Sequence, residues 1–334
     1  MKIKAIHHAA VPLPSKIRNA VIDFSQMTFS LVVVESDIVQ DGKPLYGFGF
    51  NSNGRYAQPG LIDERCIPRL ISAEPHELTD AETGTIDPVR CGDVMMKNEK
   101  PGGHGERPVA IGTIDMALWD LVSKADGQPL YQHLARRFHV DEPNPEIYCY
   151  AAGGYYYPGK GLEQLREEIE GYLALGYRDV KMKIGGASLA EDITRIEAVL
   201  DVLGGDGSRL AVDANGRFDL PTALEYGKAM QSYGLMWYEE AGDPLDYQLQ
   251  AALSANCSLP MATGENLFSM TDTRNLVRYA GMNPSRDYIQ VDPALSYGLP
   301  EYLRMLDAIS AYGWQPDRCI PHGGHQFTLH IAAA

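Results

Sequence analysis

Three acidic residues stand at regular intervals in the second half of the chain, each near the end of a short apolar run. Asp213, Glu239 and Glu265 follow one another 26 residues apart. In a barrel of parallel strands, the strand ends converge on one mouth, so these carboxylates would meet there. Converging carboxylates repel one another unless a cation lies between them, and oxygen ligands suit a hard ion such as Mg²⁺. The spacing therefore predicts a magnesium site, although acids at strand ends also cap helices.

Two lysines end the apolar run that precedes Asp213. Lys181 and Lys183 are separated by one residue, and positions i and i+2 on a strand share a face. We expect both ammonium groups to enter the same mouth. Two ammonium groups close to a divalent cation disfavour each other's charged form, which lowers a lysine pKa toward the range of a general base. The alternative, a lysine pair on a solvated strand, is disfavoured by the apolar side chains of Val180, Met182 and Ile184.

A histidine and an aspartate end two later runs. His322 lies in a Pro-His-Gly-Gly-His segment, and Asp292 ends the run before it. A carboxylate one strand away orients an imidazole and supports its charged form. His322 would then face Lys183 across a bound substrate, unless it is a structural histidine in a turn. We expect His325 to pack beside this site rather than to catalyse.

A repeated unit must position these residues, in which a short apolar strand is followed by a polar loop and an amphipathic helix. The candidate strands are residues 147–151, 179–184, 210–213, 236–239, 261–264, 288–292 and 318–322. Such alternation implies a parallel sheet with right-handed crossovers, and seven consecutive units favour a TIM-type β/α barrel. No Gly-x-Gly-x-x-Gly motif follows the first strand, which disfavours a dinucleotide-binding fold.

The chain before residue 145 has a different character. Residues 28–35 and 46–50 read as strands, and apolar residues recur at helical spacing over 111–122. We predict an α+β domain over 1–145 and a barrel domain over 146–334. The barrel section is shorter than the roughly 250 residues of a typical barrel and has no eighth candidate strand. We therefore expect a fragment, or a sequence cut before its C-terminal end.

Composition excludes several classes of protein. The net charge is −15 and no Lys/Arg cluster occurs, which argues against nucleic acid binding. The longest apolar runs fall short of the ~18 residues of a membrane span, and the N-terminus lacks the apolar core of a signal peptide. The five cysteines are scattered and suggest neither disulfides nor a zinc site. We expect a cytoplasmic enzyme with no membrane or nucleic acid partner.

The whole chain resembles the enolase superfamily, mandelate racemase subgroup. The residues that carry the resemblance are the Lys181/Lys183 pair, the Asp213, Glu239 and Glu265 set, the Asp292/His322 pair and the segment 114–120. Within this subgroup, the loops 51–56, 100–105 and 321–326 are most similar to those of the D-tartrate dehydratases. The resemblance implies an N-terminal domain that caps the barrel and sets specificity, and a homo-oligomer.

The resemblance also implies a reaction, the Mg²⁺-dependent dehydration of D-tartrate to oxaloacetate. Lys183 would remove the C2 proton, and Lys181 would lower the pKa of Lys183 and bind the substrate carboxylate. The metal would neutralise the enediolate. His322, held by Asp292, would protonate the departing C3 hydroxyl.

A hydroxy diacid has a second carboxylate that needs a positive contact of its own. Lys100 is the candidate, with Arg55 and the Asn51/Asn53 loop near the mouth, although Lys100 also fits an exposed loop lysine. Asn215, two residues beyond Asp213, is expected near the metal and the substrate.

Other functions remain open on the residues alone. The same Lys and His suit racemisation or epimerisation of a 2-hydroxy acid, or dehydration of another sugar acid. The polar loop at 51–55 favours a diacid over an aryl substrate. A non-catalytic binding protein on a decayed barrel is the alternative from another class, but decay would be expected to remove metal ligands, and none is missing.

Overall fold

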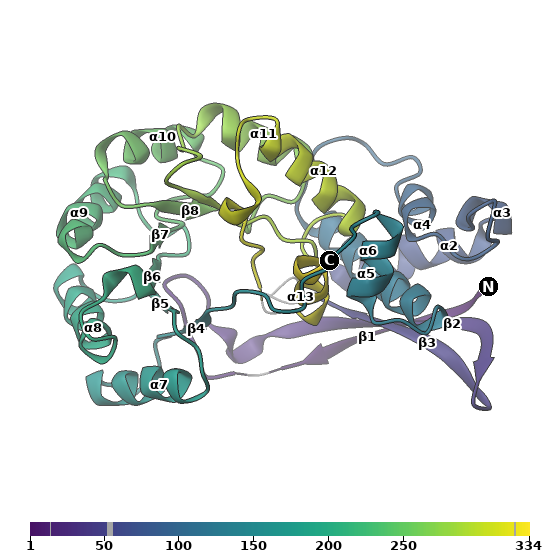
Figure 1. Cartoon of the computed structure of the whole chain (residues 1–334), viewed down its shortest axis with the longest axis horizontal. Helices are drawn as coiled ribbons and strands as arrows, with labels where there is room; N and C mark the ends of the chain where they lie inside the picture. The colour runs from purple at the N-terminus through teal and green to yellow at the C-terminus, as the bar shows by residue number, and fades with distance from the viewer. Residues whose placement is uncertain (14, 52–55, 324) are drawn as a thin grey trace.

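Two sheets organise the chain in the computed structural model, which describes residues 1–13, 15–51, 56–323 and 325–334. The first sheet is antiparallel with the order β1-β2-β3, and the second is parallel with the order β4-β5-β6-β7-β8-β9. Figure 1 shows the parallel strands along an arc with helices outside it, and the antiparallel sheet beside them. The predicted β/α barrel architecture with an N-terminal α+β part is confirmed.

The antiparallel sheet and a group of helices form the N-terminal part. Its strands are β1 (Ile3–Pro12), β2 (Thr28–Gln40) and β3 (Lys43–Phe50). Its helices are α1 (Gln58–Leu61), α2 (Ile67–Ser72), α3 (Pro75–Leu78), α4 (Pro88–Met95), α5 (Glu106–Ala125) and α6 (Leu130–Arg137). Helix α5 packs directly on β3 because Gly47 and Gly49 have no side chain there. A Cβ atom at either glycine would overlap a carbonyl oxygen of α5.

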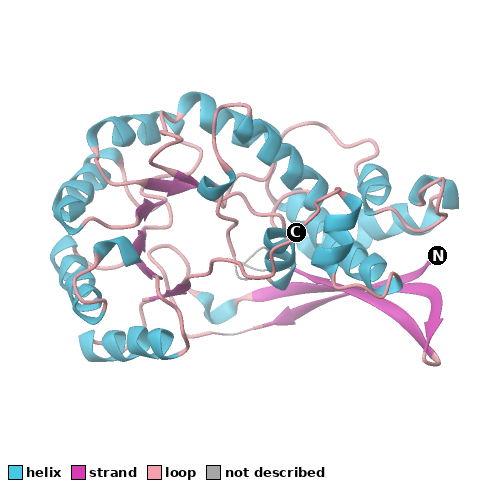
Figure 2. Cartoon of the chain, viewed as in Figure 1, coloured by secondary structure: helices cyan, strands magenta, loops and turns pink. Residues whose placement is uncertain are grey.

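The parallel sheet runs in chain order, each strand pairing with the next. Its strands are β4 (Ala151–Gly153), β5 (Val180–Lys183), β6 (Leu210–Asp213), β7 (Trp237–Glu239), β8 (Met261–Thr263) and β9 (Tyr288–Ile289). The outer helices are α7 (Leu162–Ala174), α8 (Leu189–Val202), α9 (Leu220–Met230), α10 (Tyr247–Asn256), α11 (Met270–Tyr279) and α12 (Leu299–Ser310), and α13 (Gln326–Ala333) is the last helix. Figure 2 shows the short strands lining the inside of the helical layer. Because neighbouring strands are parallel, their carboxyl ends lie at one edge of the sheet.

Three of the seven predicted strands differ from the structure by more than one residue at an end, and the one predicted at 288–292 is reduced to Tyr288–Ile289. The strand predicted at 147–151 pairs only from Ala151, which lies opposite Val180, and it extends to Gly153. The strand predicted at 318–322 is reduced to an isolated parallel bridge between Ile289 and Cys319. A 3₁₀ helix takes up Pro316–Arg318, and Pro321 has no N–H to donate to a ladder. The prediction of a full seventh strand was therefore wrong.

Buried apolar side chains connect the two parts of the chain. One core cluster joins α5 residues such as Ile114 to Leu299 and Met305 of α12 and to Phe327 of α13. Another cluster fills the space between β4–β8 and helices α7–α10. A domain boundary near residue 145 stays a prediction, and the first cluster extends across that position.

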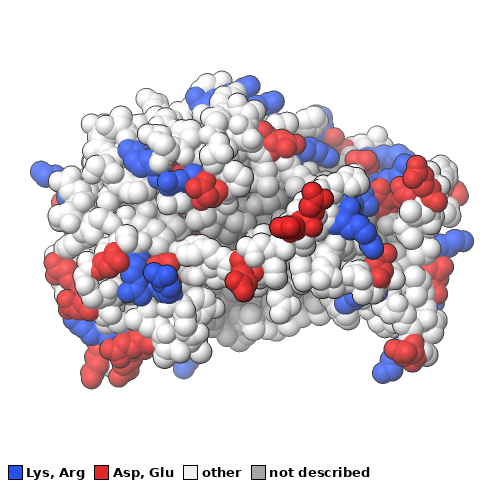
Figure 3. All heavy atoms as spheres, viewed as in Figure 1, with Lys and Arg blue, Asp and Glu red and all other residues white. Residues whose placement is uncertain are grey.

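On the face shown in Figure 3, Lys and Arg side chains are interspersed with Asp and Glu side chains, so this face offers no continuous basic area. Within the described part of the chain, no helix has both the length and the apolarity to cross a bilayer.

Candidate active site

The three predicted carboxylates converge at the carboxyl edge of the parallel sheet. Asp213 and Glu239 are the last residues of β6 and β7, where they are direct register partners, and Glu265 follows β8 by two residues. One carboxylate oxygen from each lies within 4.8 Å of one from each of the others. Asp213 and Glu239 are completely buried. The 26-residue spacing thus placed three acids at one point, as the sequence predicts.

Both lysines of β5 contact these carboxylates. The Nζ atom of Lys183 contacts Asp213 Oδ2, while Lys181 Nζ contacts Glu239 Oε1 and lies 3.2 Å from Asp213 Oδ2. Burial lowers the pKa of Lys183, but the charges of Asp213, Tyr155 and Glu265 together outweigh burial, so the pKa is raised. The pKa of Lys181 is raised as well, by Glu239 against the effect of burial. The expected lowering of the lysine pKa is therefore not seen in the protein alone, because carboxylates contact each ammonium group directly.

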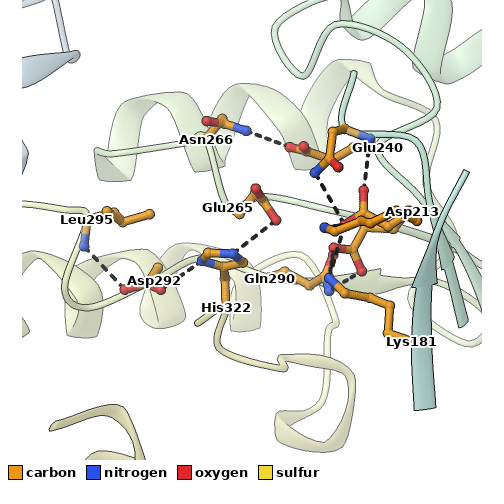
Figure 4. Close-up of polar contacts among 12 residues, drawn as sticks. Lys181, Asp213, Glu240, Glu265, Asn266, Gln290, Asp292, Leu295 and His322 are labelled. Carbon is orange, nitrogen blue, oxygen red and sulfur yellow. Dashed lines mark hydrogen bonds and ion pairs between the residues drawn. The ribbon is translucent and has the colours of Figure 1, made fainter. Parts of the chain in front are cut away.

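His322 lies on the other side of the carboxylates, between two acids. Its Nδ1 atom is 3.1 Å from Asp292 Oδ2, and its Nε2 atom is 3.2 Å from Glu265 Oε2 (Figure 4). The other oxygen of Asp292 accepts hydrogen bonds from the N–H groups of Ala294 and Leu295, at 2.6 and 3.2 Å, which fixes the carboxylate. Burial lowers the pKa of His322, but Glu265 and Asp292 outweigh it, so the pKa is raised and the charged imidazolium is favoured.

The carboxylate group fits a magnesium ion by its donor chemistry. All donor atoms are oxygens, which hard divalent ions prefer. Burial and the charge of Asp213 raise the pKa of Glu239 to about 7. The positive groups of the protein alone therefore do not fully compensate the negative charge of these carboxylates. Glu265 Oε2 is buried and has no hydrogen-bond partner among the described residues, only the ion pair with His322. Asp213, Glu239 and Glu265 would therefore hold the ion.

Residues that the sequence did not single out surround Glu239. Trp237 Nε1 and Gln290 Nε2 both donate to Glu239 Oε2, at 2.7 and 2.8 Å. Glu240, the next residue, is buried as well; burial raises its pKa well above the ordinary value, and its side chain accepts a hydrogen bond from Asn266 (Figure 4). Trp237 and Gln290 each stand two residues before a predicted site residue, so period-two alternation along a strand could have placed them on the same face as that residue, but not in contact with Glu239.

The residues predicted to contact the substrate differ in their distance from the carboxylates and in whether the structure describes them. Asn215 donates to both oxygens of Asp213, at 2.8 Å from its main chain and 3.3 Å from its side chain. Asn51 is buried, and its side-chain oxygen accepts from the Ser30 N–H at 2.5 Å. Asn53 and Arg55 lie outside the described residues. A substrate contact by Asn51 or Asn215 stays a prediction.

Lys100 is exposed, on a loop that is tied to the barrel. Arg107 donates to the main-chain oxygens of Lys100 and Gly102, at 3.0 and 2.9 Å, and to the hydroxyl of Tyr297 at 3.1 Å. Tyr297 follows Asp292 in the loop after β9, and its hydroxyl also lies 3.0 Å from His104 Nδ1. The loop 100–105 is therefore fastened to a loop that leaves the carboxyl edge, while the Lys100 side chain makes no contact with the carboxylates among the described interactions.

A comparison with protein-family models identifies the family of the chain. Residues 164–334, about half of the chain, match the model described as Enolase C-terminal domain-like. The chain belongs to the enolase superfamily. Within this superfamily, the chain belongs to the mandelate racemase subgroup, and its relatives include acid-sugar dehydratases.

The curated relatives include dehydratases of acid sugars. L-talarate/galactarate dehydratase of Salmonella typhimurium is 28% identical over 98% of this chain and 77% of its own length. Arabinonate dehydratase of Saccharolobus solfataricus is 32% identical over 70% of this chain and 60% of its own length. The chain thus spans between three fifths and four fifths of these two relatives.

Solved structures agree in fold and in metal. A racemase from Streptomyces coelicolor with bound magnesium has a TM-score of 0.79 at 25% identity, covering 99% of this chain and 86% of its own. The Salmonella dehydratase liganded with Mg and L-lyxarohydroxamate has a TM-score of 0.77 at 26% identity, covering 98% and 79%. These neighbours carry magnesium, and the acidic group of this chain is compatible with a magnesium site.

Proposed function

We propose that this chain catalyses the Mg²⁺-dependent dehydration of D-tartrate to oxaloacetate. The observation that carries the proposal is the placement of Lys183 and His322 on either side of three converging carboxylates, in contact with Asp213 and Glu265 respectively. A base and an acid that face each other across a metal-binding centre suit the removal of a proton and a hydroxyl from neighbouring carbons.

The first step is the removal of the C2 proton by Lys183. Magnesium, when held by Asp213, Glu239 and Glu265, would supply positive charge against the negative charge that develops on the substrate carboxylate. Lys181 adds a second positive charge 3.2 Å from Asp213, and this charge opposes the protonation of Lys183. Lys181 is also placed to bind the carboxylate next to C2.

The second step is the loss of the C3 hydroxyl, which leaves poorly as hydroxide. His322 supplies the proton, because Glu265 and Asp292 favour its charged form. Asp292 also fixes the ring through Nδ1, which leaves Nε2 directed to the side of the carboxylates. Hydroxyl and proton depart together as water, and the enol that remains tautomerises to oxaloacetate.

The far carboxylate of a diacid is assigned to Lys100. Arg107 and Tyr297 anchor the loop of Lys100 to the loop after β9, on the side of the sheet that holds the site. Its ammonium group has no ion-pair partner among the described residues, so it is available to a ligand. Polar residues at 51–55 support a polar rather than an aryl substrate.

A second candidate is the dehydration of a larger acid sugar. The similarity to L-talarate/galactarate dehydratase, which extends over 98% of this chain, favours it. Racemisation or epimerisation of a 2-hydroxy acid would use the same Lys183 and His322 and leave the hydroxyl in place.

One experiment separates these reactions. The protein with Mg²⁺ is incubated in D₂O with D-, L- and meso-tartrate and with galactarate, and proton NMR follows each acid. The proposal expects oxaloacetate from D-tartrate alone, and no product after the metal is removed with EDTA. Dehydration of galactarate but not of tartrate would move the assignment to the second candidate, and exchange with inversion at C2 would indicate a racemase.

A further inference from the structure

Helix α8 holds the end of β5 from outside the sheet, at a place that the chemistry above does not include. The helix begins at a capping box, in which Ser188 accepts from the Glu191 N–H and Glu191 accepts from the Ser188 N–H. Asp192 and Arg195 lie three residues apart in its first turns, and therefore on one face. Arg195 Nη1 donates to Asp192 Oδ1 at 2.8 Å.

The guanidinium group of Arg195 bridges the main chains of two strand ends. Nη1 donates to the carbonyl oxygen of Lys183 at 2.9 Å, and Nη2 donates to that of Gly154 at 2.5 Å. The pairing of β4 with β5 ends at Gly153 and Met182. Arg195 thus donates hydrogen bonds to the carbonyl groups of the first residue after the β4–β5 pairing on each strand, where β4 and β5 no longer bond to each other. One of these residues is Lys183 itself.

Asp192 fixes the residues that follow Lys183. Its completely buried carboxylate accepts from the Gly185 N–H at 2.7 Å and from the Tyr156 hydroxyl at 2.7 Å. The Tyr156 hydroxyl in turn accepts from the Gly186 N–H at 3.0 Å, and the Arg195 guanidinium lies 4.1 Å from the centre of the Tyr156 ring. The Asp192 carboxylate is buried and the Arg195 guanidinium is partly buried, and a network in which both have several partners is rigid because each polar group is satisfied in one arrangement.

We propose that Arg195 and Asp192 are positioning residues for Lys183, an inference that rests on the proposed role of Lys183 as the base. Every main-chain contact of the pair lies within three residues of Lys183 or at the adjoining end of β4. The pair lies on a helix outside the sheet (Figure 1) and so acts through the main chain rather than on the substrate. Misplacing a reacting group by about 1 Å can cost about 10²-fold in rate. Losing the bridge should therefore lower kcat while substrate binding and Mg²⁺ binding persist.

Arg209 offers a matched control at the opposite end of the same strand. Its Nε and Nη2 atoms donate to the carbonyl oxygen of Arg178, at 2.8 and 2.6 Å, and Nη1 donates to that of Leu203. Arg178 precedes β5, whereas Lys183 ends it. Arg209→Gln and Arg195→Gln therefore remove the same kind of contact, but only the second removes it from the end of β5 that carries Lys183.

The test begins with hydrogen–deuterium exchange of the full chain loaded with Mg²⁺. We expect faster exchange of the Ile184, Gly185 and Gly186 amides in Arg195→Gln and wild-type exchange of these amides in Arg209→Gln. Wild-type exchange there in Arg195→Gln would overturn the proposal. This comparison needs no substrate, so it tests whether Arg195 holds the main chain after Lys183 even if the wild-type protein turned over none of the acids, an outcome that would contradict the proposed function instead.

Kinetics on D-tartrate complete the test. We expect kcat for C2 proton exchange to fall about 10²-fold in Arg195→Gln, with KM and Mg²⁺ affinity unchanged, and Arg209→Gln to match the wild type. Arg195→Lys keeps a positive charge beside Asp192 but reaches fewer carbonyl oxygens, so it should recover part of the lost kcat. Equal kcat in the two glutamine variants, or a parallel loss of Mg²⁺ affinity in Arg195→Gln, would assign Arg195 a merely structural role.

Discussion

At the scale of single residues, the two oxygens of Glu239 have different surroundings. Oε2 accepts hydrogen bonds from Trp237 and Gln290, while Oε1 contacts Lys181 Nζ. The carboxylate is therefore held in one orientation before any ion binds. Contacts of this kind around metal ligands typically contribute 10–100-fold to metal affinity.

Replacement of Gln290 tests this orientation. Gln290→Leu removes one donor from Glu239 Oε2 and should weaken Mg²⁺ binding by about 10–100-fold, measured by isothermal titration calorimetry. Gln250→Leu is the control, since Gln250 is also buried but lies in α10, away from the carboxylates. Equal Mg²⁺ dissociation constants for the two variants would show that Gln290 does not orient the ligand.

The proposed contact between Lys100 and the far carboxylate of a diacid is open to a direct test. Lys100→Ala should raise KM for D-tartrate roughly tenfold or more, because a hydrogen bond to a charged group contributes about 1.5–3 kcal/mol. Lys97→Ala serves as the control, because Lys97 is paired with Glu77 at 2.7 Å on the same segment. Steady-state kinetics measure both variants, and an unchanged kcat/KM in Lys100→Ala would remove this contact from the account.

The sequence predicted the site residues that end strands and missed those defined by contacts across strands. Asp213, Glu239, Lys181 and Lys183 could be placed because strand ends converge in any parallel barrel. Gln290 could not be linked to Glu239 in the same way, since the two are 51 residues apart and only the fold shows which amide reaches which oxygen.

At the scale of elements, α5 and α12 meet through a buried acid. Asp115 Oδ2 accepts from the Leu299 N–H at 2.8 Å, at the start of α12, and Gly298 has a φ of 84° there. A Cβ atom at Gly298 would overlap the Asp115 carboxylate, so glycine is required both by the backbone and by the close approach. Burial raises the pKa of Asp115 to about 8.

This raised pKa predicts a dependence of stability on pH. The folded protein binds the Asp115 proton more tightly than the unfolded chain, whose pKa is near 3.8. The stabilisation is complete below that value and is lost as the pH rises to about 8. Asp115→Asn keeps an acceptor for Leu299 and does not titrate. In urea unfolding, the variant and the wild type should have equal free energies of unfolding near pH 4, and the variant should be the more stable of the two at pH 9. A wild type that is more stable than the variant at pH 9 would contradict the prediction.

Most strands were predictable from apolar runs, and the failures have local causes. The run at 210–213 became β6 with the same bounds, because both neighbouring strands pair with it along its length. The run at 318–322 contains Pro321 and follows Pro316, which a pattern of apolar residues does not weigh. His322 nevertheless reaches the site, since the bridge at Cys319 keeps this segment beside β9.

At the scale of the whole molecule, an acidic chain assembles a compact centre of opposite charges. The net charge is −15, yet two lysines and a histidine meet three carboxylates at the carboxyl edge of the sheet. Such a centre attracts an anionic substrate only with added positive charge, which a divalent ion supplies. A homo-oligomer remains a prediction of the family resemblance.

The central claim, that Lys183 acts first and His322 second, is tested most directly with His322→Asn in D₂O. Wild-type protein and variant are loaded with Mg²⁺ and given D-tartrate, and proton NMR follows the C2 signal and the formation of oxaloacetate. The account predicts that the variant forms no oxaloacetate but still exchanges the C2 proton for deuterium, because Lys183 does not need the histidine. Loss of exchange while Mg²⁺ still binds, or continued dehydration, would contradict this division of roles.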